Sequence, residues 1–276
     1  MNRDQILASA SMPLASPSYP RGPYRFINRE YFIVTYESDP QAIRDALPEP
    51  LEPDGSDTVL YEFIRMPDSS GFGDYTESGI VIPATFRGEP VNFTAQMYLD
   101  CDPPIAGGRE IWGFPKKLAS PKLGVSNGTL TGRLEFSGQP VAIATMAYKH
   151  QTLRHCPDDS SVCDFHALEH KLGKTQVNLK LIPHVDGTHA IAQLVAYNLE
   201  DITIKGGWLS PARLHLIPHA NAPVADLPVR RVVEGRHFIA DLSLPYGRVL
   251  YDYLKEGQRA EAAFARQHER AEPALA

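Results

Sequence analysis

Cysteine is scarce in this sequence, and so are long apolar runs. The 276 residues include three cysteines, Cys101, Cys156 and Cys163. Three scattered cysteines are too few for a disulfide scaffold. No apolar run approaches the roughly 20 residues that span a membrane, and the first residues, rich in Ser, Ala and Pro, contain no signal-peptide core. The sequence therefore predicts a soluble, cytoplasmic protein.

An excess of basic charge is lacking as well. The net charge at pH 7 is −6, which leaves no electrostatic footprint for a nucleic acid. We therefore expect no nucleic-acid partner and no membrane partner. The composition, 43% hydrophobic and 22% charged, is that of an ordinary globular protein, and the chain is long enough to bury a sizeable core.

Short β-rich runs separated by turn residues dominate the sequence. The runs at 31–36 and 58–64 are β-branched and aromatic, and Asn127-Gly128, between two further runs, is a strong hairpin signal. Other strand-like runs lie at 141–148, 177–182, 191–197, 202–204, 213–217, 229–233 and 237–242. Many short strands joined by hairpins predict a mainly β fold, an antiparallel barrel or sandwich.

Helical patterns are sparse and occur at 41–47, 251–256 and 259–270. Gly and Pro are spread evenly along the chain, and we find neither an internal repeat nor a linker. We therefore expect a single domain over residues 1–276, with 1–12 and 256–276 as peripheral tails.

The segment 107–118 (GGREIWGFPKKL) is the most informative part of the sequence for chemistry. It places Lys116 and Lys117 after a proline among large apolar residues. In an extended segment, neighbouring side chains point to opposite faces, so one lysine is expected to enter the apolar interior and the other to reach solvent or an acidic partner. On spacing alone, the pattern favours a solvated lysine pair on an edge strand.

The Gly-Arg-Glu and Phe-Pro-Lys-Lys-Leu of this segment resemble the Schiff-base signature of the acetoacetate decarboxylase family. The resemblance extends from about Pro13 to Lys255. It is carried by 16–30 (SPSYPRGPYRFINRE), 48–51 (PEPL), 74–82 (DYTESGIVI), 97–100 (MYLD), 144–150 (ATMAYKH) and 249–254 (VLYDYL). Two regions differ from the family: the segment 156–174 is longer, and the tail after Lys255 is extra.

The resemblance implies the roles of particular residues. Lys116 takes the Schiff-base role, with Lys117 as its neighbour. The polar residues implied for the active site are Arg29, Glu62 and Glu77, and the looser candidates for its walls are Phe26, Met97 and Leu99. The resemblance also implies a mainly antiparallel closed barrel or cone with few helices, and a homo-oligomer as high as a dodecamer. We expect no cofactor and no metal.

Schiff-base chemistry needs a neutral lysine, whereas the reference pKa of lysine is about 10.4. Lowering that pKa to near 6 costs about 6 kcal/mol. A like charge about 6 Å away supplies roughly 0.7 kcal/mol in water and about 3 kcal/mol at an effective dielectric of about 20. Burial can lower a lysine pKa by about 3–5 units. We therefore expect burial to be the main cause and Lys117 a secondary one. The expected apolar wall is Ile111, Trp112, Phe114 and Leu118.

The charge of the substrate changes during a decarboxylation, and this suggests roles for the acidic residues. An unopposed Arg29 would stabilise the bound acid more than a transition state in which the charge is leaving. Pairing with Glu77 would temper that grip, and Glu62 is a candidate proton shuttle. The alternative is that the three residues form surface ion pairs.

Two other motifs are set aside. The segment from His166 to His170 fits the H-x-x-E-H zinc pattern, but that chemistry needs a long helix and the flanks leave little helix. An incidental metal contact from these histidines or from Cys156 and Cys163 is a minor alternative. Gly107-Gly108 is interpreted as a bend.

The sequence thus predicts a decarboxylase that converts acetoacetate, a small β-keto acid, to acetone and CO₂. One alternative is an aldolase or dehydratase of the same fold that acts on pyruvate-like substrates. Another is a non-catalytic barrel that binds a small acid. Arg29, Glu62 and Glu77 together favour the decarboxylase, and the segment 156–174 is expected not to be catalytic.

Overall fold

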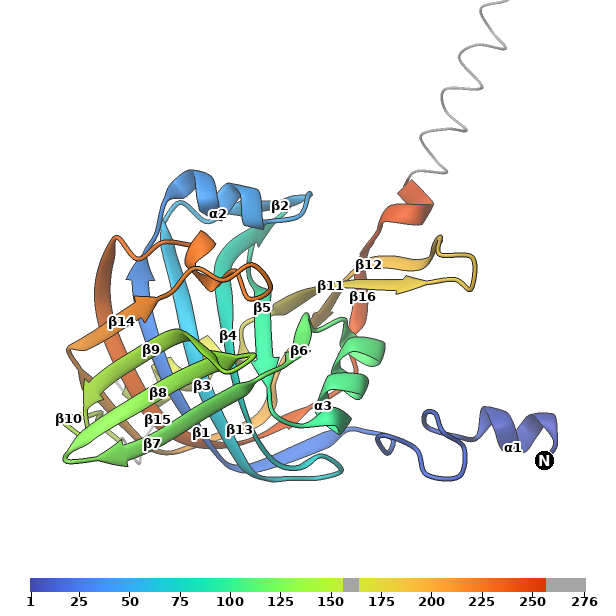
Figure 1. Cartoon of the computed structure of the whole chain (residues 1–276), viewed down its shortest axis with the longest axis horizontal. Helices are drawn as coiled ribbons and strands as arrows, with labels where there is room; N and C mark the ends of the chain where they lie inside the picture. The colour runs from blue at the N-terminus through green and yellow to red at the C-terminus, as the bar shows by residue number, and fades with distance from the viewer. Residues whose placement is uncertain (156–163, 257–276) are drawn as a thin grey trace, which may run out of the picture.

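The computed structural model describes residues 1–155 and 164–256, and most of them lie in two β-sheets (Figure 1). The mainly β prediction is confirmed. The larger sheet contains β1 (Tyr24–Glu37), β2 (Leu51–Pro53), β3 (Thr58–Ser69), β4 (Gly73–Phe86), β5 (Glu89–Leu99), β6 (Lys116–Leu118), β10 (Gln151–Thr152), β11 (Gln176–Pro183), β12 (His189–Tyr197), β13 (Glu200–Ser210), β15 (Arg231–Leu244) and β16 (Arg248–Asp252). The smaller sheet contains β7 (Ser120–Ser126), β8 (Thr129–Phe136), β9 (Gln139–Ala147) and β14 (Ala212–Leu216).

The predicted runs 31–36 and 58–64 lie within β1 and β3, which pair antiparallel. The predicted hairpin is also present, as β7 and β8. Asn127 and Gly128 at its turn have φ values of 47° and 69°. Positive φ at both central residues defines the type I′ turn, whose twist matches that of the flanking strands, so these two residues explain the hairpin locally.

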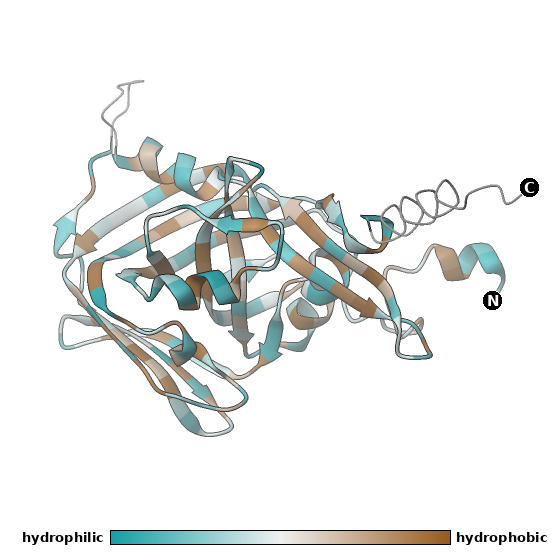
Figure 2. Ribbon diagram, turned by 90° about the horizontal axis from the view of Figure 1, so that it is seen from above, coloured by the Kyte–Doolittle hydropathy of each residue, from teal (hydrophilic) through white to brown (hydrophobic). Residues whose placement is uncertain are grey.

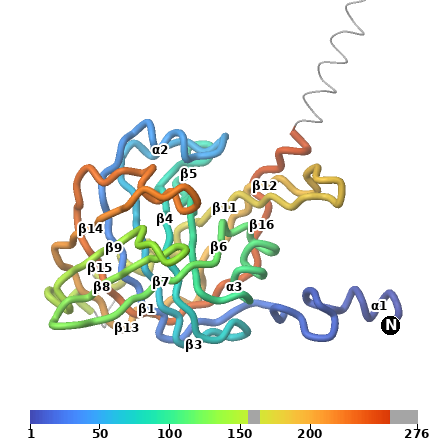
Figure 3. The backbone as a smooth tube through the Cα atoms, viewed as in Figure 1, coloured from blue at the N-terminus to red at the C-terminus, as the bar shows by residue number. Residues whose placement is uncertain are grey.

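The larger sheet is open, so the predicted closed barrel is wrong in that respect. Its hydrogen-bonded order runs from β10 through β13, β15, β1, β3, β4, β5, β11 and β12 to β16, and within the described residues the two end strands do not pair. Strand β5 meets β11 in parallel over only two residue pairs. Beyond this short junction, β11 and β12 extend away from the other strands (Figures 1 and 3), which keeps the edges of the sheet apart.

Two apolar clusters form the core, and β1 contributes to both. Phe32, Val34 and Tyr36 of β1 belong to the cluster that joins the larger sheet to the smaller one. Tyr31, on the opposite face, belongs to the second cluster. Figure 2 shows the resulting alternation of apolar and polar residues along the strands. Because side chains alternate along a strand, the even residues of β1 from Phe32 to Tyr36 pack this core, while the odd residues from Arg29 to Thr35 are free to line a site.

The helices are short. They are α1 (Arg3–Leu7), α2 (Pro40–Ala46), α3 (Asp102–Gly107) and α4 (Asp164–Gly173), together with a π-helical turn, η1 (Gly108–Trp112), and a 3₁₀ turn, η2 (Val224–Asp226). Helix α1 lies away from the sheets (Figure 1), whereas residues 257–276 of the expected C-terminal tail lie outside the described residues. Among the described helices, none is both long and apolar enough to cross a membrane.

Candidate active site

The segment that carries Lys116 is a helix followed by a sharp change of direction. Gly107 ends α3 and Gly108 begins the π-helical turn, so the predicted bend at this pair is in fact helical. The turn ends at Gly113, whose φ of 76° is left-handed and whose hydrogen faces the backbone of Lys180, where a Cβ would overlap. Only glycine fits that conformation and that space. Strand β6 follows and pairs in parallel with β5.

Lys116 and Lys117 face in opposite directions, as expected for neighbours in an extended segment. The side chain of Lys116 is 7% exposed. Its Nζ lies 4.8 Å from the ring centroid of Phe114 and 5.9 Å from that of Tyr75. Lys117 is exposed, and its Nζ donates a hydrogen bond to the carbonyl oxygen of Asn221. Lys116 is therefore the lysine that enters the interior.

Glu77 lies between two cations. Its Oε2 is 3.4 Å from Nζ of Lys116, and its Oε1 is 3.3 Å from Nη2 of Arg29. The three side chains come from β4, β6 and β1, and all are almost fully buried. A register shift in the pairing of β1 with β15 between Phe26 and Arg29, next to Asn28 with a φ of 55°, precedes Arg29. Such irregularities redirect the side chains that follow them.

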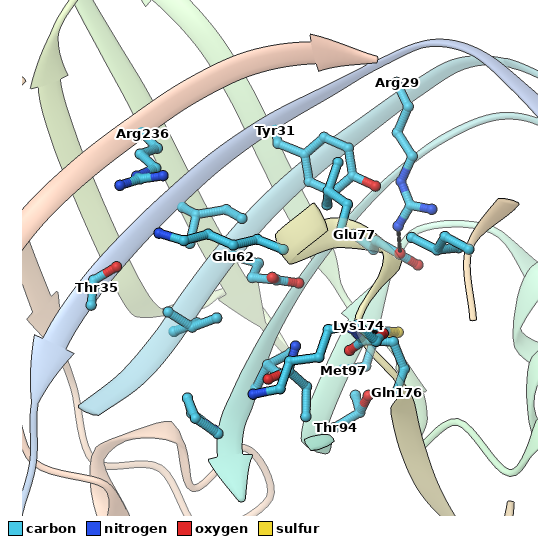
Figure 4. A pocket seen from close by; sticks show the side chains of 18 of the residues that line it. Arg29, Tyr31, Thr35, Glu62, Glu77, Thr94, Met97, Lys174, Gln176 and Arg236 are labelled. Atoms are coloured by element: carbon cyan, nitrogen blue, oxygen red, sulfur yellow. Dashed lines mark hydrogen bonds and ion pairs between the residues drawn. The ribbon is translucent and has the colours of Figure 1, made fainter. Parts of the chain in front are cut away.

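These residues line one end of a cavity of about 460 Å³. Arg29, Tyr31, Ile33 and Thr35 lie along it because they share one face of β1. At about 3.3 Å per residue, Arg29 and Thr35 are roughly 20 Å apart along the strand. Figure 4 shows Arg29 with Glu77 in one part of the cavity and Arg236 in another. The other lining residues that enter the argument are Phe26, Glu62, Met97, Phe114, Lys116, Tyr75, Tyr197, Leu168, Lys171, Leu172 and Lys174.

Burial lowers the pKa of Lys116 below its ordinary value. The Glu77 carboxylate opposes this effect, and the Arg29 guanidinium adds to it. Burial is thus the largest cause, as expected, but the like charge that assists it belongs to Arg29. Lys117, the secondary cause expected from the sequence, points away from the cavity.

Glu62 lies on β3, opposite Ile33 of β1, and its side chain also lines the cavity. Burial raises the pKa of Glu62 to about 7, an effect that Arg29 opposes and Glu77 strengthens. Near neutral pH, the protonated and ionised forms of this carboxyl group are therefore both populated. A carboxyl group with such a pKa is suited to proton transfer.

The expected wall residues fall into three groups. Phe26, Met97 and Phe114 line the cavity. Trp112 is buried behind Phe114, with ring centroids 6.1 Å apart, and its indole N–H donates to the carbonyl oxygen of Pro245. Three further residues do not line it: Leu99 is buried in the core, Ile111 is half-buried, and Leu118, the last residue of β6, is 66% exposed.

The sequence did not single out the tyrosines of the site. Tyr31, Tyr75 and Tyr197 all line the cavity. Each lies in a β-strand, where tyrosine is common as a packing residue, so its position in the sequence carries no functional signal. Knowledge of which face of each strand carries Arg29 and Glu77 would have identified Tyr31 and Tyr75, two residues away on the same faces.

Helix α4 corrects the expectation of little helix around the H-x-x-E-H pattern. It begins at Asp164 and spans ten residues, with Phe165 and Leu168 buried at helical spacing. His166 and His170 are exposed. Cys156 and Cys163, the other candidate metal ligands, lie outside the described residues. In the described ranges 1–155 and 164–256, no group of three or more His, Cys, Asp or Glu residues could hold a metal ion.

Helix α4 and the residues after it also contribute to the cavity, through Leu168, Lys171, Leu172 and Lys174. The described part of the segment that was expected to differ from the family, residues 164–174, therefore forms part of the wall of the candidate site. This placement gives it contact with whatever enters the cavity, whether or not it takes part in chemistry.

A mainly β fold with a buried lysine in the wall of a cavity is suited to an enzyme that acts on a small molecule. Comparison with known proteins makes the class specific. A family model described as acetoacetate decarboxylase (ADC) matches residues 11–254. The chain belongs to the acetoacetate decarboxylase family.

Individual relatives cover almost the whole chain. The acetoacetate decarboxylase of Paraburkholderia xenovorans is 53% identical, over 94% of this chain and 98% of that protein. The acetoacetate decarboxylase of Ralstonia nicotianae is 54% identical, over 92% of this chain and 99% of that protein. The crystal structure of acetoacetate decarboxylase from Legionella pneumophila matches with a TM-score of 0.84 and 49% identity, over 92% of this chain and 97% of that one.

Proposed function

We propose that this protein decarboxylates acetoacetate to acetone and CO₂ through a Schiff base on Lys116. The observation that carries the proposal is the burial of Lys116, with a lowered pKa, at the end of a cavity that also holds Arg29, Glu62 and Glu77. Membership of the acetoacetate decarboxylase family supports the substrate. Apart from the substrate and water, the proposed reaction uses only side chains of this protein.

The proposed reaction proceeds in four steps. The neutral amine of Lys116 attacks the ketone carbon, and loss of water leaves an iminium ion. The bond between the carboxyl carbon and the adjacent methylene then breaks, CO₂ leaves, and the electron pair moves to the iminium nitrogen to give an enamine. A proton is added to the enamine carbon, and water hydrolyses the new iminium, which releases acetone and the free amine. The cationic nitrogen thus accepts the electrons that the carboxylate leaves behind.

Trapping the iminium tests the assignment of the nucleophile. Borohydride with acetoacetate should add a covalent mass to the peptide that contains Lys116, because reduction makes the iminium bond permanent. Lys117→Ala should be labelled as wild type is, since Lys117 faces Asn221 outside the cavity. Lys116→Ala should lose the label. Labelling on Lys117 instead would show that Lys116 is not the nucleophile.

Gly108 gives the Lys116 side chain the space that it occupies. A Cβ on Gly108 would lie 2.7 Å from Cδ, 3.0 Å from Cε and 3.2 Å from Nζ of Lys116. Lys116 is closely surrounded, because Glu77 and the Phe114 ring lie on its other sides. The amine would therefore have to move away from its present position if Gly108 carried a side chain.

We accordingly expect Gly108→Ala to lower kcat/KM for acetoacetate by roughly 10²-fold, because a displacement of about 1 Å at a reacting atom costs about that much. Gly124→Ala is the matched control, since a Cβ at Gly124 meets no atom within 4 Å. Steady-state CO₂ release from the two variants, with circular dichroism to check folding, makes the comparison. Equal activities would show that Lys116 tolerates the displacement.

The pair formed by Arg29 and Glu77 is proposed to orient the substrate without holding it too tightly. Acetoacetate arrives as an anion and its carboxyl group leaves as neutral CO₂. Arg29 without Glu77 would stabilise the bound anion more than the transition state, which does not help the chemical step. The 3.3 Å contact between the two side chains supports the view that they act together.

Three variants test this coupling. Glu77→Gln should lower kcat with KM steady or lower, because ground-state binding strengthens. Arg29→Gln should raise KM and also lower kcat through lost orientation. The double variant should be less impaired than the two losses combined, since the residues share one interaction. Strictly additive losses in kcat/KM would mean that Arg29 and Glu77 act independently. Thermal unfolding of each variant controls for the buried charge that is left unpaired.

Glu62 is proposed to supply protons for iminium formation and enamine protonation, and its pKa of about 7 sets an expected pH dependence. The acid form of Glu62 is lost as the pH rises through about 7, so kcat/KM should fall above that pH. Glu62→Gln should lower activity and abolish this decrease. A pH profile of kcat/KM for both proteins is the measurement, because kcat/KM reports groups of the free enzyme. A decrease that persists in Glu62→Gln would assign it to another group.

Other expectations from the sequence remain predictions. They are the homo-oligomer as high as a dodecamer, the cytoplasmic location, the single domain with peripheral tails and the absence of a catalytic role for 156–174. The alternatives of a pyruvate-specific aldolase or dehydratase and of a silent binding protein are not favoured by any feature of the described site.

A further inference from the structure

Tyr31 is held rigidly at the Arg29 end of the cavity. It lies two residues from Arg29 on the same face of β1 and is 2% exposed. Its ring is stacked on Phe238, with ring centroids 4.5 Å apart and an interplanar angle of 15°. The Cζ of Arg29 lies 4.8 Å from the centroid of the Tyr31 ring. These contacts on the ring leave the hydroxyl group in a fixed position.

The hydroxyl of Tyr31 is buried and has no hydrogen-bond partner in the described part of the chain. Other buried tyrosines are satisfied within the protein: Tyr36 donates to the carbonyl oxygen of Leu227 at 3.1 Å, and Tyr98 donates to Oε1 of Gln96 at 2.9 Å. A buried donor without an acceptor costs about 1–3 kcal/mol, so such groups usually have a reason to persist. Tyr31 differs from Tyr36 and Tyr98 in that it lines the cavity.

The surroundings of the hydroxyl indicate which group would satisfy it. Burial raises the pKa of Tyr31, so the phenol stays neutral and its O–H can donate a hydrogen bond. Its neighbour Arg29 is a cation, and Nε of Arg29 is also buried without a partner among the described residues. Two donors, one of them charged, fit an anionic oxygen acceptor. Arg29 and Lys116 contact the two oxygens of the same Glu77 carboxylate, so an acid whose ketone carbon is bound to Lys116 lies close to Arg29.

We propose that the Tyr31 hydroxyl donates a hydrogen bond to the carboxylate of the β-keto acid and is a substrate-binding residue of this site. The inference rests on the proposed function, because it assigns the carboxylate of the Schiff-base substrate to the Tyr31 and Arg29 side. Figure 4 shows Tyr31 and Arg29 side by side in the same part of the cavity. A neutral donor suits a departing carboxylate, because it orients the group while binding it less strongly than a second cation would.

Tyr31→Phe tests the proposal, because it removes the hydroxyl and keeps the ring that stacks on Phe238. KM for acetoacetate should rise about tenfold, the loss expected for one hydrogen bond to a charged group, with a much smaller change in kcat. Adduct formation with 2,4-pentanedione should change much less, because a methyl group replaces one of the two carboxylate oxygens and the negative charge is lost. Its conjugated adduct with a lysine can be followed by ultraviolet absorbance.

Tyr36→Phe is the matched control, because it also removes one buried tyrosine hydroxyl but at a site outside the cavity. It should leave both kinetic constants unchanged and lower the melting temperature, since the carbonyl oxygen of Leu227 loses its donor. Tyr31→Phe should not lower the melting temperature, because its hydroxyl has no partner to lose.

Three results would overturn the proposal. The first is an unchanged KM for acetoacetate in Tyr31→Phe. The second is adduct formation with 2,4-pentanedione that is weakened as much as acetoacetate binding, which would indicate a role in imine formation. The third is a melting temperature of Tyr31→Phe lowered as much as that of Tyr36→Phe. Failure of the proposed function would look different. In that case wild type would form no borohydride-stable adduct on Lys116 with acetoacetate.

Discussion

Two basic side chains, Arg29 and Lys116, share one buried carboxylate in this protein, and the other properties of the site depend on this excess of positive charge. Glu77 contacts both Arg29 and Lys116, and the side chains of Glu77 and Lys116 are 4% and 7% exposed. Burial of an uncompensated charge costs several kcal/mol. A guanidinium group does not lose its proton in a protein, so the excess positive charge is relieved most readily at Lys116. Burial and Arg29 together therefore favour the neutral amine, the form that can attack a ketone.

The strands that carry these charges are stabilised from their opposite faces. On β1, Phe32 and Val34 are fully buried in the core while Arg29 and Tyr31 line the cavity. On β3, Tyr61 and Phe63 are buried in the same way, with Glu62 between them on the cavity face. Each large apolar side chain contributes about 1.5–3 kcal/mol on burial. Alternation along a strand thus lets one face hold the sheet together while the other face carries polar groups that destabilise it.

This difference between the apolar core face and the polar cavity face of the strands also explains what the sequence could predict. The runs 31–36 and 58–64 and the Asn127-Gly128 turn were identified because local pattern and turn chemistry determine them. Strands β4 and β5 were not identified, because residues such as Glu77 and Gly79 interrupt their apolar pattern. Gly79, for example, lies where a Cβ would be 2.6 Å from the carbonyl oxygen of Gln96 on β5.

Features that depend on distant parts of the chain also escaped the sequence. The open edge of the sheet follows from the short junction between β5 and β11, and the role of α4 in the cavity wall follows from its packing. Lys116 was found through its motif and the opposite directions of neighbouring side chains. The sequence could not show that Arg29, rather than Lys117, helps to lower the pKa of Lys116, because this depends on how β1 and β6 lie in space.

A lysine that must be neutral and fixed in position presents a physical conflict. A strong ion pair would fix the amine, but it would also favour the charged form and raise the pKa. Here the contact of Nζ with Glu77 is 3.4 Å, and Arg29 competes for the same carboxylate. The side chain is instead held by shape, between the Phe114 ring and the bare backbone of Gly108. Close packing fixes the position of the amine without a second carboxylate to hold its charge, and the bare backbone of Gly108 leaves the space in which the Lys116 side chain lies.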